Sequence, residues 1–364
     1  MTYISLYDDL IYLVSLALIM FSVAKHFLRT ASFMPGLVVL ENTLVAGVAL
    51  LAAWYIGFRP EDTPGDTEIY VNVYKTLVGG GETLSVPFET GFITLIQLLG
   101  VGGADHYYFF MVIPFLLLVS YHKLAASIFG SRSSLPLLCV AIIVYYPFFL
   151  SLTANVIRQG LAVSFILLAL SLVLTEHKKI AGVISISAVL FHRSAVIALP
   201  FFMLVSRIVR FSFSQLVAIW LFVSVASYFK VFAAVVSLVF SLLASQGISF
   251  DYSSVDSVEY QSGFRFDFWL FSSLSIALFF VLHVLGRKAD RVAPVFYISC
   301  YFAIVHIAMF DIAFNDRFGV YAWVLFPLQI LYLIRCVLGQ GMDFSLPPDT
   351  ELDAQRARKI AGQE

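Results

Sequence analysis

The sequence predicts an all-α membrane protein with about nine full transmembrane helices and one re-entrant helical hairpin, or up to eleven segments if each arm of the hairpin is counted. Two observations predict this class. Of the 364 residues, 60% are hydrophobic and only 12% are charged, and the mean hydropathy is +0.92. In addition, several apolar runs approach the ~20 residues that a helix needs to span a bilayer. A soluble domain does not need so much apolar surface, and the net charge of −1 gives no sign of a nucleic-acid partner.

Positive charges set the direction of each crossing, because Lys and Arg next to membrane segments favour the cytoplasm. Lys25, His26 and Arg29 follow the first apolar run, so we expect the N-terminus outside and the end of that run in the cytoplasm. Glu41, near the start of the second run, is expected to be an interfacial residue. The nine expected crossings are residues 10–28, 35–58, 107–121, 135–150, 156–174, 214–228, 264–285, 294–310 and 318–334. Residues 1–338 therefore form one transmembrane domain, and the polar tail of residues 339–364 is expected in the cytoplasm.

Two segments between crossings are predicted at the outer face, residues 59–106 and 231–263. In the first, Pro64-Gly65 is typical of a turn, and Asp66 is either the N-cap of the helix that follows or a site residue. That short helix is expected to lie along the membrane surface. Its apolar face contains Tyr70, Val73, Tyr74 and Leu77.

Two more interfacial helices are predicted in these outer segments. Residues 88–99, with Glu89 at their start, are apolar but too short to cross a bilayer. In the second outer segment, residues 231–244 predict an interfacial helix or, alternatively, the continuation of the preceding crossing as one long tilted helix. The polar and acidic residues that follow are expected outside.

An apolar run at residues 180–206 is long enough to cross the bilayer, but His192, Arg193 and Ser194 interrupt its middle. A charged side chain in the membrane is costly and usually marks a functional site. Cations flank the run on both sides, at Lys178, Lys179, Arg207 and Arg210. If both ends are cytoplasmic, the run must enter and return as two half-helices with His192-Arg193-Ser194 at the turn. The alternative is one kinked helix in which the long side chain of Arg193 reaches the interface.

Four arginines each open a helix that descends from the outer face under this topology: Arg158, Arg193, Arg265 and Arg317. A helix N-terminus carries a partial positive charge, so a cation there is disfavoured unless an anion is present. The guanidinium group also suits two-point contacts with phosphate or carboxylate. We therefore predict a set of anion sites. For a single arginine, the alternative is a surface pair with an acid, such as Arg265 with Asp267 or Arg317 with Asp316.

An outward-facing, diphosphate-sized anion site in a membrane suggests a sugar linked to a polyprenyl diphosphate. Guanidinium groups can stabilise the charge on the leaving diphosphate without a metal or another cofactor. The cysteines, Cys139, Cys300 and Cys336, show no metal-ligand spacing. The attacking sugar hydroxyl needs a proton acceptor, and the candidates are His192, Glu89, Asp66 and Asp267. The alternative for His192 is a hydrogen-bonded histidine that orders the hairpin turn.

The polar motifs occur in the order Arg59, Gly65-Asp66, Tyr70, Tyr74, Glu89-x-Gly91-Phe92, Asn155-x-x-Arg158-Gln159-x-Leu161-Ala162, Phe191-His192-x-Ser194-Ala195, Gly263-x-Arg265-x-Asp267, and Arg317 with Tyr321. This order resembles the EpsG-like, Wzy-type polysaccharide polymerases from about Arg59 to Tyr332. The most specific portions are residues 158–162 and the Phe191-His192-x-Ser194 turn.

The resemblance implies a bacterial inner-membrane glycosyltransferase. Such an enzyme moves a growing glycan from undecaprenyl diphosphate onto the next lipid-linked repeat unit, at the periplasmic or outer face, and so makes O-antigen or exopolysaccharide. Carried over, the active-site residues are Arg158, His192, Arg265 and Arg317, with Glu89 and Asp66 as further catalytic candidates. The expected substrate-binding residues are Arg59, Tyr70, Tyr74, Asn155, Gln159, Arg193, Ser194, Asp267 and Tyr321, of which Arg193 matches no family position and is included on the charge argument alone. The expected partners are lipid-linked glycans, the bilayer, a chain-length regulator and a flippase.

Two alternative functions fit the same residues. An O-antigen ligase uses the same donor and leaving group but takes lipid A core as the acceptor. A flippase for lipid-linked oligosaccharides is a transporter, and it would need charge on both faces of a central cavity. Here the cytoplasmic cations occupy loop positions, where they act as topology signals.

Overall fold

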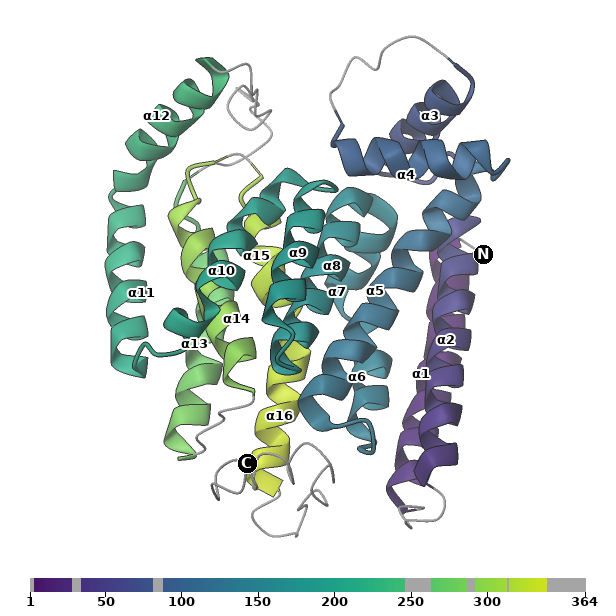
Figure 1. The fold of residues 1–364 in the computed structure, drawn as a ribbon, viewed down its shortest axis with the longest axis horizontal. Helices are drawn as coiled ribbons and strands as arrows, with labels where there is room; N and C mark the ends of the chain where they lie inside the picture. Colours follow the sequence, from purple (N-terminus) through teal and green to yellow (C-terminus); the bar gives the residue numbers. More distant parts are fainter. Residues whose placement is uncertain are drawn as a thin grey trace.

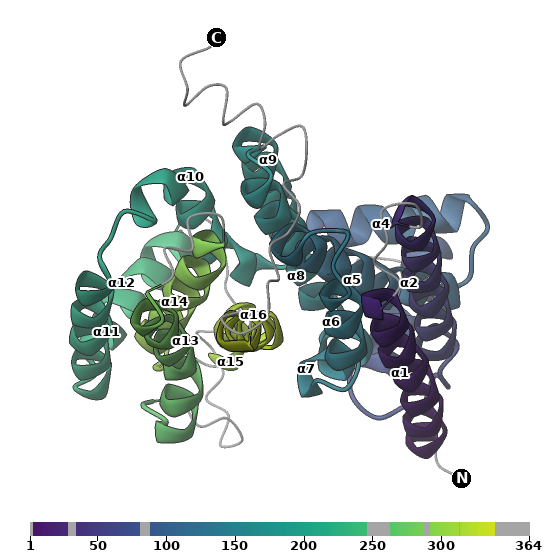
Figure 2. The same cartoon turned by 90° about the horizontal axis from the view of Figure 1, so that it is seen from below.

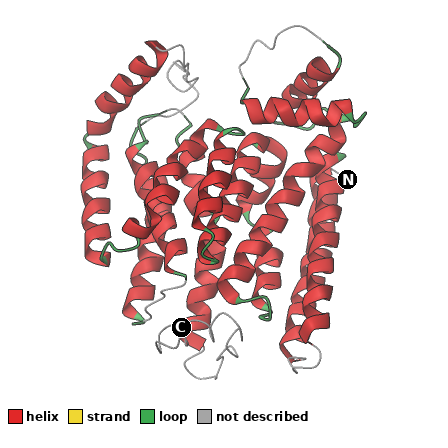
Figure 3. Cartoon of the chain, in the orientation of Figure 1, coloured by secondary structure: helices red, strands yellow, loops and turns green. Residues whose placement is uncertain are grey.

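The computed structural model describes residues 3–27, 34–80, 88–245, 263–286, 292–312 and 314–338, and within these ranges every regular element is a helix (Figure 3). The predicted all-helical class is therefore confirmed. The predicted polar tail, residues 339–364, and residues 246–262 of the second outer segment lie outside the described residues.

The helices of the N-terminal half are α1 (Tyr3–Phe27), α2 (Met34–Gly57), α3 (Thr67–Val78), α4 (Thr90–Val101), α5 (His106–Phe129), α6 (Leu135–Ile143), α7 (Pro147–Leu150), the π-helix η1 (Ser151–Asn155) and α8 (Ile157–Leu174). Those of the C-terminal half are α9 (Lys178–Val189), the 3-10 helix η2 (Arg193–Ala198), α10 (Leu199–Ile208), α11 (Phe213–Tyr228), α12 (Val231–Ser245), α13 (Phe266–Val284), α14 (Ala293–Ala308), α15 (Asp316–Trp323) and α16 (Phe326–Leu338).

Six helical segments among the described residues are long and apolar enough to cross a membrane, by length and composition. They are Asp9–Phe27, Gly36–Gly57, His106–Phe129, Ile157–Leu174, Phe266–Val284 and Asp316–Leu338. A seventh is the pair Leu135–Ile143 and Pro147–Asn155, which is bent by 67°. The sequence predicted nine full crossings, which exceeds this count. Two of the predicted crossings correspond to α11 and α14, which have only 16 residues each.

The long helices run side by side, and α4 lies across one end of them (Figure 1). We call this the α4 end, and the opposite end, where α16 finishes, the α16 end. Figure 2, seen from below, places α15 and α16 between α1, α2, α5 and α6 on one side and α10 to α14 on the other. In the core, α5 packs against α2 and α8, and α8 packs against α9. Side chains of α8 are buried along most of its length.

The short helices predicted between the second and third crossings are present as α3 and α4. In α3, Tyr70, Val73 and Tyr74 are buried and Leu77 packs beside them, as the helical spacing predicted. These residues pack on α4 and α5. Farther along, Lys230 has a left-handed backbone (φ 57°) between α11 and α12, so the chain makes two helices there, not one long one.

The run at residues 180–206 is broken in the middle. The helix α9 runs toward the α4 end and stops at Val189, and α10 turns back from that end (Figure 1). Between them, His192 is extended and a 3-10 turn follows. His192, Arg193 and Ser194 therefore lie in the break between the two helices, which we call the hairpin turn, and the re-entry of this run into a membrane stays a prediction.

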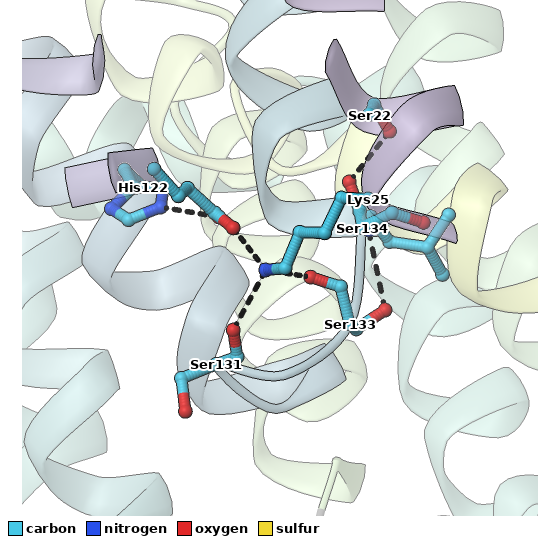
Figure 4. A network of polar contacts seen from close by, with 8 residues as sticks. Ser22, Lys25, His122, Ser131, Ser133 and Ser134 are labelled. Carbon is cyan, nitrogen blue, oxygen red and sulfur yellow. Dashed lines mark hydrogen bonds and ion pairs between the residues drawn. The ribbon is translucent and has the colours of Figure 1, made fainter. Parts of the chain in front are cut away.

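A buried ion pair ties the helices together toward the α16 end (Figure 4). The Lys25 ammonium pairs with Glu41 and donates to the carbonyl oxygens of Ser131 at 2.9 Å and Ser133 at 2.6 Å. The other carboxylate oxygen of Glu41 lies 3.0 Å from Nε2 of His122. The Glu41 side chain is buried and links α1, α2 and α5, a role that the sequence did not indicate, and its interfacial depth in a membrane stays a prediction.

Candidate functional site

The site begins where the first turn of α4 contacts the hairpin turn. The amide of Gly91 donates to the carbonyl of Leu190, at the end of α9, at 2.8 Å. A Cβ at position 91 would lie 2.7 Å from that carbonyl oxygen. Only glycine permits so close an approach. This contact places Glu89, two residues earlier, directly beside the turn.

The Glu89 carboxylate joins two of the predicted anion-site residues. Its Oε2 lies 2.7 Å from Nη1 of Arg158, and its Oε1 accepts a hydrogen bond from the backbone N–H of Arg193 at 3.2 Å. The side chain is buried and does not cap its own helix, although Glu89 occupies the N-cap position of α4. The guanidinium group of Arg158 also lies over the ring of Phe88, 4.8 Å from the ring centroid. Glu89 thus links α4, α8 and the hairpin turn.

The start of α3 forms the next wall of the site. Burial raises the pKa of Tyr70, and the charge of Arg158 and its hydrogen bond to the Tyr70 hydroxyl oppose this rise. Asn155 fastens the turn before α3, because its Oδ1 accepts a hydrogen bond from the Asp66 amide at 3.1 Å. Gly65 makes this turn with a φ of 106°. The side chain of Asp66 does not cap α3, so its carboxylate is not used by the helix.

His192 is buried at the hairpin turn. Its Nδ1 accepts from the backbone N–H of Ser194 at 3.2 Å and lies 2.6 Å from the Ser194 hydroxyl, which in turn lies 3.0 Å from the Tyr321 hydroxyl. A backbone N–H can only donate, so Nδ1 is the unprotonated nitrogen of the neutral ring and Nε2 carries the proton. Burial lowers the pKa of His192 well below its usual value, and the charges of Arg158, Arg317 and Arg193 lower it further. His192 is therefore a neutral N–H donor.

Arg317 reaches the same place from a distant segment of the chain. Its carbonyl oxygen accepts a hydrogen bond from the Gln159 amide, which fixes the start of α15 to the start of α8. Its guanidinium group lies over the ring of Phe314, 4.5 Å from the ring centroid. Because the charges of Arg158 and Arg317 act on both Tyr70 and His192, these residues belong to one electrostatic cluster. The structure thus gathers most of the predicted site residues at the α4 end.

Arg265 has the partner that the sequence offered as an alternative. Its Nε lies 3.2 Å from Oδ1 of Asp267, and its Nη2 contacts Oδ2, so the pair is bidentate. The guanidinium group also lies over the ring of Phe268, 3.7 Å from the ring centroid. Asp267 lies in the first turn of α13, where the partial positive charge of the helix N-terminus also favours a carboxylate. An anion at Arg265 would have to compete with this carboxylate.

Arg59 and Tyr74 make contacts within the fold. Arg59 is 1% exposed, and it donates to Thr67 Oγ1 at 3.0 Å and to the Ile56 carbonyl at 2.9 Å. It therefore holds the start of α3 against the end of α2. The Tyr74 hydroxyl donates to the Ala104 carbonyl at 2.6 Å. These contacts position α3, and the substrate role of Arg59 and Tyr74 stays a prediction.

Sequence reasoning missed the function of two further residues. A Cβ at Gly160 would lie 2.0 Å from the carbonyl oxygen of Leu152, so glycine lets the π-helix fold back onto α8 beside Arg158 and Gln159. Phe88 supports the Arg158 guanidinium, and its only signal in the sequence is its place next to Glu89. Among the described residues, no group of three or more His, Cys, Asp and Glu side chains is placed to hold a metal ion. The charges that this site offers an anion are guanidinium groups.

Fold and site define a multi-pass helical membrane protein with an arginine-rich site at one end of its helices. The sequence matches the EpsG family over residues 42–340. The chain belongs to this family of Wzy-like polysaccharide polymerases and glycosyltransferase-like membrane proteins. The match covers every site residue from Arg59 to Tyr321 and confirms the resemblance. No curated protein and no solved structure matches the chain.

Proposed function

We propose that this protein polymerises undecaprenyl-diphosphate-linked oligosaccharides into O-antigen or exopolysaccharide at the outer face of the bacterial cytoplasmic membrane. The observation that carries the proposal is that Arg158, Arg193 and Arg317 lie together beside His192. Glu89 joins Arg158 to the Arg193 backbone, and Gln159 donates to the Arg317 carbonyl. They come from α8, the hairpin turn and α15, and a cluster of cations from distant segments favours a multiply charged anion. Membership of the EpsG family supports a glycan substrate.

The proposed topology has nine crossings and a re-entrant hairpin. Both α11 and α14 are apolar, and 16 residues of helix are roughly 24 Å long, so a modest local thinning of the bilayer lets them span it. Cations at both ends of the hairpin, Lys178 and Arg210 among them, favour the same side for both. The N-terminus and the α4 end then face outward, and the C-terminus is cytoplasmic.

In the proposed reaction, Arg158 and Arg317 hold the diphosphate of the donor. A hydroxyl oxygen of the acceptor sugar attacks the anomeric carbon, and the bond from that carbon to the diphosphate oxygen breaks. The electron pair stays on the departing undecaprenyl diphosphate, where the guanidinium groups stabilise it. The hydroxyl proton passes to a carboxylate, Glu89 or Asp66. His192 would act as the base only in its other tautomer, and in the tautomer described above its Nε2–H donates to a substrate oxygen.

The remaining predicted contacts are kept as part of the proposal. Arg265 with Asp267 contacts the glycan or the diphosphate at the start of α13. Tyr70 lines the groove beside Arg158. Ser194 and Tyr321 orient His192, and Gln159 and Asn155 hold the backbone of the site.

Lysine substitutions test the proposal in a strain whose only copy of the gene carries Arg158→Lys or Arg317→Lys. Lysine keeps the charge but loses the planar fork, so we expect single repeat units to accumulate and long chains to disappear. The matched control is Arg210→Lys, at the exposed end of α10, which should leave chain length unchanged. Long chains at the normal level in both site variants, with normal amounts of protein, would refute the proposal.

An assay with purified protein and lipid-linked repeat units separates the alternatives. A polymerase produces a ladder of lengths without any other enzyme. A flippase produces none, and a ligase requires lipid A core as the acceptor.

A further inference from the structure

The Glu89 carboxylate already pairs with the Arg158 guanidinium group, which the donor diphosphate would need to contact. Its Oε2 is 2.7 Å from Nη1 of Arg158, the contact expected of a charge-assisted pair. We propose that Glu89 is a resident anion that the donor diphosphate displaces, and that the freed carboxylate then accepts the proton of the acceptor hydroxyl. This inference rests on the proposed function and deepens it, because it assigns the general base and the condition under which that base becomes available.

Arg158 has contacts other than Glu89 that hold its guanidinium group in place. Phe88 lies beneath its guanidinium group, 4.8 Å away, and the Tyr70 hydroxyl is hydrogen-bonded to it. The Arg158 side chain is 21% exposed, whereas that of Glu89 is 7% exposed. The guanidinium group is therefore the member of the pair that a ligand from outside can reach, and it does not depend on Glu89 alone for its position.

Glu89 is likewise held near the site after an exchange. Its Oε1 accepts from the backbone N–H of Arg193 at 3.2 Å, and the Gly91–Leu190 hydrogen bond fixes the backbone two residues later. When its contact with Arg158 breaks, the Glu89 carboxylate therefore stays beside the hairpin turn, and its Oε2 becomes available. His192, in the same turn, holds its proton on Nε2, and its Nδ1 is engaged by the Ser194 backbone N–H and hydroxyl, so neither ring nitrogen is available as the base.

The exchange is favoured because a diphosphate carries more charge than one carboxylate and can also contact Arg317. The proton of the acceptor hydroxyl then passes to Oε2 of Glu89. The electron pair of the O–H bond forms the new bond to the anomeric carbon, and the pair of the broken bond leaves with the diphosphate. When the lipid diphosphate departs, Glu89 gives its proton to water and pairs with Arg158 again. The base is therefore available only while the donor is bound.

The test compares binding with turnover. Purified full-length protein in detergent is titrated with inorganic pyrophosphate, and polymer is measured in cells that carry the same variant. Glu89→Gln removes the competing charge but keeps the shape of the side chain. We expect pyrophosphate to bind about tenfold tighter, the scale of one charge-assisted contact. Polymer should fall by roughly a hundredfold or more, because the base is lost.

Two further variants make the result specific. Glu68→Gln changes the charge by the same amount on the exposed side of α3, and should alter neither readout appreciably. Glu89→Asp keeps a carboxylate, so pyrophosphate affinity should stay near that of the wild type and part of the polymer should return. If Glu89 had only a structural role, Glu89→Gln would instead weaken pyrophosphate binding and lower the melting temperature.

The outcomes separate the two proposals. If Arg158→Ala abolishes pyrophosphate binding but Glu89→Gln binds no tighter than the wild type, the resident-anion inference is overturned and the transferase function stands. The inference is also overturned if Glu89→Asp behaves like Glu89→Gln in both readouts. If Arg158→Ala and Arg317→Ala bind pyrophosphate as the wild type does, the proposed function itself fails.

Discussion

Replacing Gly91 by alanine tests whether the contact between α4 and the hairpin turn assembles the site. A Cβ at this position would lie 2.7 Å from the carbonyl oxygen of Leu190 and 2.8 Å from its Cβ. Neither distance is tolerated, and the carbonyl belongs to the backbone at the end of α9, so it cannot rotate away. The first turn of α4 must therefore move back by about half an ångström, enough to restore van der Waals contact.

The cost follows from the contacts that this movement breaks. The Gly91–Leu190 hydrogen bond, 2.8 Å long, contributes roughly 1 kcal/mol. Strain from an added methyl group in a packed contact costs about 1–3 kcal/mol, and the better helix propensity of alanine returns at most ~1 kcal/mol. The same movement lengthens the contact of Glu89 with Arg158 and the hydrogen bond from Arg193 to Glu89. We expect polymer to fall by roughly tenfold or more, because misplacement on this scale weakens catalysis strongly.

Gly182→Ala is the matched control for this substitution. Gly182 lies in α9, the helix that ends in the same turn, and apart from the adjacent residues and the nearby backbone of α9 no described atom lies within 4 Å of its added Cβ. Alanine there should raise the melting temperature slightly and leave polymer length unchanged. The measurements are the thermal unfolding of purified protein and the polysaccharide ladder from cells. If Gly91→Ala matches the wild type in both, the docking of α4 does not set up the site and the proposed role of Glu89 loses its geometric basis.

Two further predictions concern other parts of the structure. Glu41→Gln leaves the fully buried Lys25 ammonium without its countercharge, so we expect a loss of about 3–5 kcal/mol, seen as a lower melting temperature. Replacing both residues together, as Lys25→Met with Glu41→Leu, should recover much of that loss, and no recovery would contradict this account. Ser194→Ala removes the hydroxyl between His192 and Tyr321, so polymer should fall at an unchanged melting temperature. Ser187→Ala in α9, where the hydroxyl donates to the Val183 carbonyl of the same helix, is its control.

Local patterns were enough to predict the helices and the buried face of α3. Helical spacing of Tyr70, Val73 and Tyr74 places them on one side whatever the rest of the chain does, and the structure buries all three. The break at His192 was also predictable, because polar residues interrupt an otherwise apolar run. Each of these features depends on residues less than about ten positions apart, which is the range over which periodicity carries information.

Contacts between distant segments were not predictable in the same way. Nothing near Lys25 in the sequence indicates that Glu41 and the loop after α5 would bury it. The sequence likewise predicted one crossing at residues 135–150, whereas the chain bends by 67° between α6 and α7, at the place that Pro147 marks. Burial and bending are decided by packing between elements, so a local pattern can mark such positions without fixing their geometry.

The sequence predicted that the arginines need an anion, and for two of them the tertiary structure supplies a carboxylate. A guanidinium group at a helix N-terminus needs negative charge, and this led to the prediction of bound phosphate. Within the fold, however, Arg158 pairs with Glu89 and Arg265 pairs with Asp267. A phosphate can therefore bind at either arginine only by displacing the carboxylate. Its binding free energy is the difference between the interaction free energies of the two anions with the guanidinium group. A singly charged ligand gains little from such an exchange. Under the proposed function, a diphosphate that spans Arg158 and Arg317 would gain much more, and the resident carboxylate would then favour a doubly phosphorylated carrier over a singly charged ligand.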